Sequence, residues 1–407
     1  MEFRFNKEQE ELRQEVHDFF VNELPEDYDP GARVTGDEEG TRFFMELQKK
    51  VVDRGWLTAG WPKKYGGLGF TSIEQGVISE EMGYWIRSLW PSQGGFWLAG
   101  PVILAVGTEE QKGKFVPPIA RGDWIVLEAF TEPNAGSDEA NCQLRAIPDG
   151  DDYILNGQKT FITGWVKPDW LYTLARTAET TPKHRGLSIF MVPGDAPGIS
   201  YRPLPTMGGS MQNEIFYDNV RVPKENLIGE INRGFYAAMA TFEFERASIS
   251  QEARRGMVEL VDFYRKEKRN GKPLIKDPEV RKMLARRAMQ QQVMWLSGWH
   301  ASWRRTRWEK LGPQTYDLTM FLRKDSAPDE AEAIMDTLGL YSQLKPGSKY
   351  SKYNGVVQRL WEASRVIHPA GSPEILKVVI ANRGLGLPRI PRKFNTVINE
   401  ALSEGDN

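Results

Sequence analysis

Residues 152–164 read DYILNGQKTFITG. Two short runs rich in β-branched and aromatic residues flank Asn156-Gly157, a dipeptide that favours a two-residue hairpin turn. We therefore predict two antiparallel strands joined at this pair. Similar strand-like runs lie on either side, in DWIVLEAF (123–130), WLYTLART (170–177), GLSIFMVP (186–193) and NEIFYDNVRVP (213–223). Together they predict a β domain over residues 124–233.

Helical patterns occupy the chain before and after this region. Asn6 and Thr108 are each followed three residues later by glutamine, which predicts two helix-starting capping boxes. Further helices are predicted at 41–55 and 72–86, with the Pro- and Gly-rich AGWPKKYGGLGF (59–70) as a loop between them. After the β region, Ser372-Pro373 is typical of an N-cap followed by an N1 proline. We predict a bundle of helices from segments 234–268, 278–309, 329–341, 352–367 and 372–383.

Composition excludes several classes of protein. The 407 residues carry 53 basic and 55 acidic side chains, a net charge of -2, which argues against nucleic-acid or membrane-surface binding. No apolar run is long enough to insert into a membrane. Cys142 is the single cysteine and the four histidines are scattered, so we expect neither a disulfide nor a metal site. The acidic N-terminus is not typical of a secretory signal. We expect a cytoplasmic enzyme, with a matured organellar one as the alternative.

The segment ATFEFERASIS (240–250) places charges in a helix that is otherwise apolar. On a helical wheel, Arg246 falls near the centre of the apolar stripe and Glu245 at its edge. One interpretation is a surface or buried structural charge pair. The other is a stripe that faces a cleft, with Arg246 binding an anionic ligand and Glu245 desolvated towards the pKa range of a general base. The pattern alone leaves both open.

Other motifs have an ordinary structural interpretation beside a functional one. The loop TEPNAGSD (131–138) is a polar connection, or a ligand site whose small residues and hydroxyls approach a bound group. The threonines of TFITG (160–164) suit a strand in any case. A tryptophan at every fourth position, Trp295, Trp299 and Trp303, predicts packing in a core or a subunit interface. The nearby arginines 304, 305 and 307 are interpreted as a solvated face rather than a phosphate site.

Taken in order, these motifs resemble the acyl-CoA dehydrogenase family over nearly the full chain. The matching segments are GWPKKYGG (60–67), GTEEQKGKFVPPIARGDW (107–124), TEPNAGSD, NGQKTFITG (156–164), FYDNVRVPKENLIGE (216–230) and RGLGLPR (383–389). The resemblance implies an α+β, mostly α fold: an N-terminal helical domain (1–123), a middle β-barrel-like domain (124–233) and a C-terminal four-helix bundle (234–407).

The resemblance also implies FAD, held between the β domain and the bundle. Phe130 and Thr131 are then expected along the pyrimidine side of the flavin, and Thr163 near its N5. Phe161 stands where many members carry a tryptophan against the ring. Ser137 is expected near the pyrophosphate or the acyl-CoA, and Ser372 is placed with the cofactor-binding residues.

The expected catalytic base follows from a departure within the family. Most members carry a glutamate before Gly-Thr, but here Ala370 occupies that position in HPAGSPEI (368–375), and alanine cannot take a proton. A minority of members, the isovaleryl and long-chain types, place the glutamate before the arginine of the first bundle helix, which is Glu245 here. Arg246 then resembles the CoA-binding arginine, and Glu243 matches a position that contacts the pantetheine arm. The backbone N–H of Ala370 is expected to donate to the thioester oxygen.

Other departures concern the adenine end of FAD. The segment KRNGKPL (268–274) lacks the family's Arg-x-x-Phe-Gly, and LGLYSQL (338–344) replaces a Gly-Gly-x-Gly segment. TMGGSMQNE (206–214) is shorter than its counterpart. We expect an acyl-CoA dehydrogenase for a branched, cyclic or bulky acyl group, with electron-transfer flavoprotein as acceptor and a homodimer or homotetramer as the assembly. The alternatives are an acyl-CoA oxidase, an enoyl-CoA reductase, or a non-catalytic subunit of a hetero-oligomer.

Overall fold

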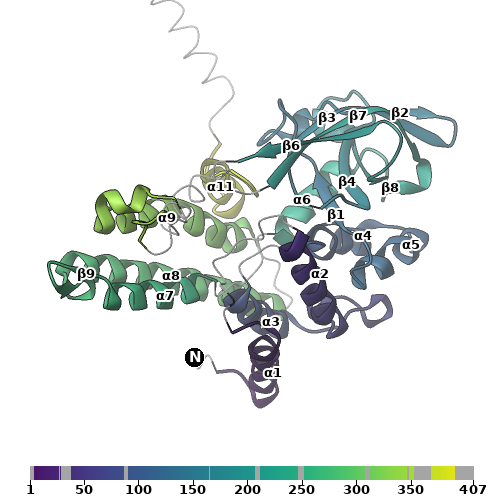
Figure 1. The fold of residues 1–407 in the computed structure, drawn as a ribbon. Coiled ribbons are helices and arrows are strands. Elements are labelled where there is room, and N and C mark those ends of the chain that lie inside the picture. The colour runs from purple at the N-terminus through teal and green to yellow at the C-terminus, as the bar shows by residue number, and fades with distance from the viewer. Residues whose placement is uncertain are drawn as a thin grey trace, which may run out of the picture.

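The computed structural model of the chain describes residues 4–26, 28, 38–86, 90–164, 166–206, 211–245, 252–307, 312–345, 348–352 and 368–389. Helices come first, an eight-stranded sheet follows, and helices return, which confirms the predicted order (Figure 1). Among the described helices, none combines the length and apolar character that crossing a bilayer requires.

The first helices begin where the sequence provides caps. Asn6 and Thr108 form capping boxes with Gln9 and Gln111, as predicted, and Thr71 forms a third with Glu74. These caps satisfy amide donors that a helix start otherwise leaves unpaired. The elements are α1 (Lys7–Glu23), α2 (Glu38–Asp53), η1 (Trp56–Thr58), η2 (Lys63–Tyr65), α3 (Ser72–Trp85), the π-turn η3 (Gly94–Ala99), α4 (Gly100–Val106) and α5 (Glu109–Ala120).

The sheet is mixed, with strand order β6-β7-β3-β2-β4-β5-β8 and β1 paired in parallel with β4. Its strands are β1 (Val126–Ala129), β2 (Arg145–Asp149), β3 (Asp152–Thr163), β4 (Trp170–Arg176), β5 (Leu187–Pro193), β6 (Ile199–Pro205), β7 (Met211–Pro223) and β8 (Leu227–Ile228). The short 3-10 turns η4 (Glu139–Asn141), η5 (Lys183–Gly186) and η6 (Lys224–Asn226) lie between them. β3 is paired on one side with β2 and on the other with β7, so it lies inside the sheet.

The predicted hairpin at Asn156-Gly157 is wrong. β3 runs unbroken through this pair, and the chain reverses earlier, where Asp149 of β2 pairs with Asp152 of β3 around Gly150. Gly157 instead lies at a register shift against β7, with φ of 147°. A Cβ there would stand 2.9 Å from the Cα of Leu144. The glycine is therefore required by close approach of two backbones and not by a turn.

The C-terminal helices are α6 (Gly234–Glu245), α7 (Glu252–Lys266), α8 (Pro278–Thr306), α9 (Pro313–Leu338) and α11 (Pro373–Val379), with the π-turn η10 (Ile380–Gly384) after α11. β9 (Lys268–Arg269) and β10 (Lys272–Pro273) form a small hairpin between α7 and α8, before η7 (Leu274–Lys276), and η8 (Gly339–Gln343) follows α9. Ser372 and Pro373 cap α11 as predicted. The helix predicted from residue 329 starts instead at Pro313, because Pro328 lies inside α9 rather than at its start. Nearly all of the helix predicted at 352–367 lies outside the described residues.

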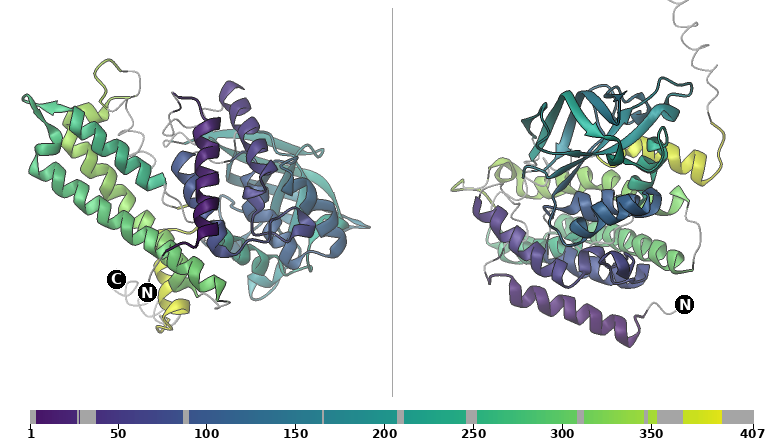
Figure 2. Two further views of the ribbon diagram at one scale, coloured as in Figure 1. Left: turned by 90° about the horizontal axis from the view of Figure 1, so that it is seen from below. Right: turned by 90° about the vertical axis from the view of Figure 1, so that its right-hand side faces the viewer.

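The two helical regions are joined by polar contacts of the tryptophan stripe. On α3, the carboxylate of Glu80 is 2% exposed and accepts hydrogen bonds from the indoles of Trp295 (3.0 Å) and Trp299 (2.6 Å) on α8. The predicted packing role is therefore met within one chain. Figure 2 shows α7, α8 and α9 as a group of long helices beside the N-terminal ones. In Figure 1 and the right view of Figure 2, α11 lies between α9 and the sheet.

Candidate active site

The loop at 131–138 and strand β3 are brought together through the sheet interior. The backbone N–H of Thr160 donates to the carbonyl of Thr131 at 2.9 Å. The ammonium of Lys159 is fully buried and donates to the carbonyl of Phe130 and to the carboxylate of Glu132, both at 2.8 Å. Phe130 and Thr131 are thus fixed against the strand that carries Phe161 and Thr163, as the motifs predicted.

Glu132 organises the chain on the other side of this loop. Its carboxylate also accepts from the backbone N–H groups of Gln143 (2.6 Å) and Leu144 (2.9 Å) and from the thiol of Cys142 (3.1 Å). Burial raises the pKa of Glu132, but the charge and hydrogen bond of Lys159 and these donors outweigh it, so the net pKa lies below its ordinary value. Burial also raises the pKa of Cys142 to about 11, so this thiol is protonated near neutral pH and is not a nucleophile.

Ser137 lies in the exposed part of the loop. Glu132 and Ala135 close a small bridge at the start of this segment, and Ser137 itself is exposed. Beyond it, the half-exposed guanidinium plane of Arg176 is not what holds the loop tip; its buried Nε and Nη2 donate to the carbonyls of Cys142 (2.8 Å) and Ala140 (2.7 Å) and so fix the end of the loop. The tip is therefore open to solvent while both of its ends are held.

Phe161 is unusual in both backbone and exposure. Its φ is 57°, a left-handed conformation that is costly for a bulky residue, and 57% of its side chain is exposed although it belongs to an interior strand. The register of β3 against β7 shifts between Lys159 and Ile162, so Phe161 lies in a bulge. Beyond it, the amide of Asn213 donates to the carbonyl of Gly164 at 2.8 Å. The sheet thus holds an aromatic ring outward in a strained conformation, which is typical of a ligand-binding position.

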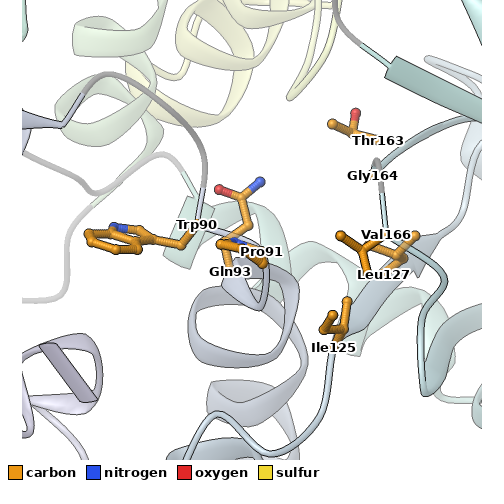
Figure 3. A pocket seen from close by; sticks show the side chains of 8 residues that line it. All are labelled: Trp90, Pro91, Gln93, Ile125, Leu127, Thr163, Gly164 and Val166. Carbon is orange, nitrogen blue, oxygen red and sulfur yellow. The ribbon is translucent and has the colours of Figure 1, made fainter. Parts of the chain in front are cut away.

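Thr163 lines a small cavity of about 20 Å³. The other lining residues come from the N-terminal helical region, from β1 and from the chain after β3: Trp90, Pro91, Gln93, Ile125, Leu127, Gly164 and Val166. Figure 3 shows Thr163 at one side of this pocket, across from Gln93 and Trp90. The polar groups of Thr163 and Gln93 thus stand above a largely apolar floor, an arrangement suited to a flat, partly polar ligand.

Ala370 and Ser372 lie in the turn before α11. Ala370 has φ of 57° and Gly371 has φ of 92°, so two successive residues are left-handed. The hydroxyl of Ser372 accepts from the backbone N–H of Ile375 at 3.4 Å and caps α11. The buried ammonium of Lys324 on α9 donates to the carbonyls of Pro369 and Gly371 and holds the turn in place.

The charged segment at the end of α6 is described only in part. Glu243 accepts a hydrogen bond from the hydroxyl of Tyr316 on α9 at 3.1 Å. Glu245 is the last residue of α6, but its side chain lies outside the described residues, and Arg246 lies wholly outside them. The structure therefore does not place the predicted base and CoA-binding arginine relative to the rest of the site.

The arginines at the end of α8 do not all form a solvated face, as the sequence suggested. Arg304 donates to the hydroxyl of Thr315 at 3.0 Å. Burial lowers the pKa of Arg305, and the nearby charge of Glu243 acts in the opposite direction. The reason is that the start of α9 covers this end of α8 and brings Tyr316 against Glu243. Arg307 is exposed, as predicted.

Sequence analysis missed the lysines and the tyrosine that hold the site. Lys159 was visible as a lysine inside a strand, and such a residue is costly to bury unless it is paired. No comparable signal marked Lys324 or Tyr316, because α9 was predicted to begin after both of them. Their roles depend on which helix face meets the α11 turn and the end of α6, and that is set by tertiary packing.

Comparisons with known proteins cover the whole arrangement. Three family models match: acyl-CoA dehydrogenase, N-terminal domain, over residues 6–123; middle domain, over 128–220; and C-terminal domain, over 232–385. The acyl-CoA dehydrogenase FadE26 of Mycobacterium tuberculosis is 31% identical, over 96% of this chain and 100% of that protein.

Two solved structures are similar throughout. One is the ChsE4-ChsE5 complex from Mycobacterium tuberculosis, with TM-score 0.83 and 29% identity over 96% of this chain and 100% of that chain. The other is the Tcur3481-Tcur3483 steroid ACAD, with TM-score 0.84 and 32% identity over the same shares of the two chains.

The buried ion pair gives a first prediction. We expect Lys159→Met to lower the free energy of unfolding by about 3–5 kcal/mol at pH 7, because it leaves the carboxylate of Glu132 buried without its cation. The wild-type pair stabilises the fold above the unfolded pKa of Glu132, about 4.3, and this contribution is lost as the pH falls through the lowered folded pKa. In the variant, burial raises that pKa, so protonation relieves the penalty and the stability gap narrows between pH 7 and pH 4.5. Urea unfolding at several pH values measures the gap.

The matched control is Lys159→Met combined with Glu132→Gln, which removes the charge but keeps an acceptor for the amides of Gln143 and Leu144. It recovers much of the lost stability. A gap that stays constant with pH, or a double variant no better than the single one, contradicts the assignment of Glu132 as the stranded charge.

Proposed function

This chain belongs to the acyl-CoA dehydrogenase family, and we propose that it oxidises the Cα–Cβ bond of a bulky acyl-CoA thioester with FAD as cofactor. The observation that carries the proposal is the joining of the 131–138 loop to β3 around an exposed, strained Phe161. An aromatic ring held outward at such a cost, with threonine hydroxyls beside it, suits a planar ring system.

The residues present fit FAD. Phe161 would lie against the flavin ring, Thr163 near N5, and Phe130 and Thr131 along the pyrimidine side. Ser137, on the exposed tip of the loop, would be near the pyrophosphate or the acyl-CoA, and Ser372 would also serve the cofactor. Bound FAD supplies a two-electron acceptor for hydride. The adenine end has no assignment among these residues.

The chain's own groups would carry the proton chemistry. The carboxylate of Glu245 takes the α-proton, the β-hydrogen leaves with its electron pair, and the Cα–Hα electrons form the new C=C bond. Because the α-carbon is weakly acidic, the thioester oxygen needs hydrogen-bond donors as negative charge develops on it. The backbone N–H of Ala370 is one such donor. Glu243 and Arg246 would bind the CoA arm, with Tyr316 orienting Glu243 through its 3.1 Å hydrogen bond.

The proposed acyl group is branched, cyclic or otherwise bulky. With alanine at 370 and the base on α6, no carboxylate side chain occupies the α11 side of the substrate's reacting carbons. One similar solved protein is described as a steroid ACAD, which supports a large ring-bearing substrate class. We propose electron-transfer flavoprotein as the acceptor, as part of a β-oxidation sequence; slow reaction of the reduced enzyme with oxygen separates this from an oxidase.

The cofactor gives the second prediction. Purified protein is expected to be yellow and to carry FAD in a ratio near one per chain, bound without a covalent link. Acid precipitation then releases the flavin into the supernatant, where chromatography identifies it. A colourless, folded protein that does not take up added FAD, alone or with a co-purifying partner chain, overturns the proposed function.

The base gives the third prediction. Glu245→Gln keeps the fold and FAD but slows flavin reduction by about 10²–10⁴-fold, because a general base is lost. Arg246→Ala serves as the contrasting variant, since it weakens acyl-CoA binding and retains part of the chemistry. The measurement is anaerobic stopped-flow bleaching of the flavin, with a substrate found by screening acyl-CoA thioesters. Bleaching of Glu245→Gln at nearly the wild-type rate rejects this base and directs attention to Glu243 and then Glu374.

Assembly gives the fourth prediction. We propose a homodimer or homotetramer, with a hetero-oligomer as the alternative, since one similar solved structure is a complex of two named chains. Exposed apolar residues on α8, Met289 (64% exposed), Val293 (51%) and Leu296 (46%), form a stripe that a second subunit would cover. Light scattering of the FAD-bound protein at micromolar concentration is expected to give a multiple of the 46.4 kDa chain, and a monomer contradicts the proposal.

A further inference from the structure

Lys324 on α9 joins a distant helix to the turn that carries Ala370. Its side chain is almost wholly buried, with 8% exposed. The ammonium donates to two backbone carbonyls, those of Pro369 and Gly371, the second at 2.6 Å. These two carbonyls stand on either side of Ala370 in the chain, so both peptide units that flank this residue are held by one charged group.

Holding these carbonyls also fixes the direction of an N–H group. In a trans peptide unit the carbonyl oxygen and the amide hydrogen point in opposite directions. The carbonyl of Pro369 shares its peptide unit with the N–H of Ala370. With that carbonyl directed at Lys324, the Ala370 N–H is directed away from α9.

The turn would not hold this geometry without support. Ala370 and Gly371 both have positive φ, 57° and 92°, and for alanine the left-handed conformation costs roughly 1–2 kcal/mol. Residues in such conformations persist where the surrounding structure fixes them, and this often occurs at active sites. Here the fixing group is a buried cation, which forms stronger hydrogen bonds to carbonyls than a neutral donor does.

A cation on the carbonyl also changes the amide itself. Hydrogen bonds in a chain polarise one another, so an ammonium that withdraws electron density at the carbonyl of Pro369 makes the N–H of Ala370 a stronger donor. We propose that Lys324 is a positioning residue that directs and polarises the Ala370 N–H towards the thioester oxygen. This inference rests on the proposed function, and it adds a residue on α9 to the groups that stabilise charge on that oxygen.

The test uses a probe that reports donor strength without turnover. Acetoacetyl-CoA forms an enolate when its carbonyl oxygens are stabilised, and the enolate absorbs in the ultraviolet. The FAD-bound wild type, Lys324→Met, Lys324→Gln and Lys377→Met are each mixed with the probe, and the pH at which half of the bound probe is enolate is measured. Lys377→Met is the matched control: it removes a neighbouring exposed cation that pairs with Asp325 at 3.5 Å and does not contact the turn.

We expect Lys324→Met to decrease the enolate-to-ketone ratio by about tenfold at a fixed pH, a fraction of the 10²–10³-fold effect of deleting an oxyanion donor outright. Lys324→Gln keeps a donor but no charge, so it is expected between the wild type and Lys324→Met. Lys377→Met is expected to match the wild type. Flavin content and thermal unfolding show which variants keep the holoenzyme fold, and Lys324→Gln takes the place of Lys324→Met if the latter does not fold.

Two outcomes overturn the inference and are distinguishable from each other. If the folded Lys324 variants enolise the probe at the wild-type midpoint, or if Lys377→Met shifts it equally, the lysine does not act through the Ala370 amide. If the FAD-bound wild type itself neither binds nor enolises acetoacetyl-CoA, the proposed thioester chemistry fails, and the inference fails with it.

Discussion

The buried pair of Lys159 and Glu132 is the interaction on which the arrangement of the site depends. The lysine comes from an interior strand and the glutamate from the loop that carries Thr131 and Ser137, and each reaches across to satisfy backbone groups as well as the other's charge. Burying two charges is favourable only when nearly every donor and acceptor is used. Because that condition is met here only in one relative position of loop and strand, the pair specifies where Phe130, Thr131 and Thr160 lie.

The same principle recurs at two other junctions. Glu80 on α3 accepts from both tryptophans of α8 and so sets the N-terminal helices against the bundle. Lys324 on α9 sets the turn before α11. In each case a buried charged group fixes one element against another that is distant in sequence. The strained residues, Phe161 and Ala370, lie beside two of these fixed points, which is consistent with conformational strain being tolerated where the surroundings leave no alternative.

Much of this could be predicted from local sequence and the rest could not. Helix caps at Asn6, Thr108 and Ser372 were predictable because they depend on residues within one turn. The Asn-Gly pairs show the limit. Asn270-Gly271 does form the tight turn of a hairpin, between β9 and β10, with φ of 50° and 76°. Asn156-Gly157 does not, because the glycine is needed where β3 passes close to Leu144, a contact that no local pattern reveals.

The site followed the same division. The motif residues were recognisable one by one, but the groups that hold them, Lys159, Lys324 and Tyr316, act across distances of many residues along the chain. The account makes one claim about the complete site: the carboxylate of Glu245, the backbone of Ala370 and the ring of Phe161 surround one thioester and one flavin. A crystal structure of the FAD-bound protein with a non-reactive acyl-CoA analogue measures this. The account predicts the Glu245 carboxylate as the acid nearest the analogue's α-carbon, with the Ala370 N–H on the thioester oxygen. Another acid at the α-carbon, or a flavin away from Phe161 and Thr163, contradicts it.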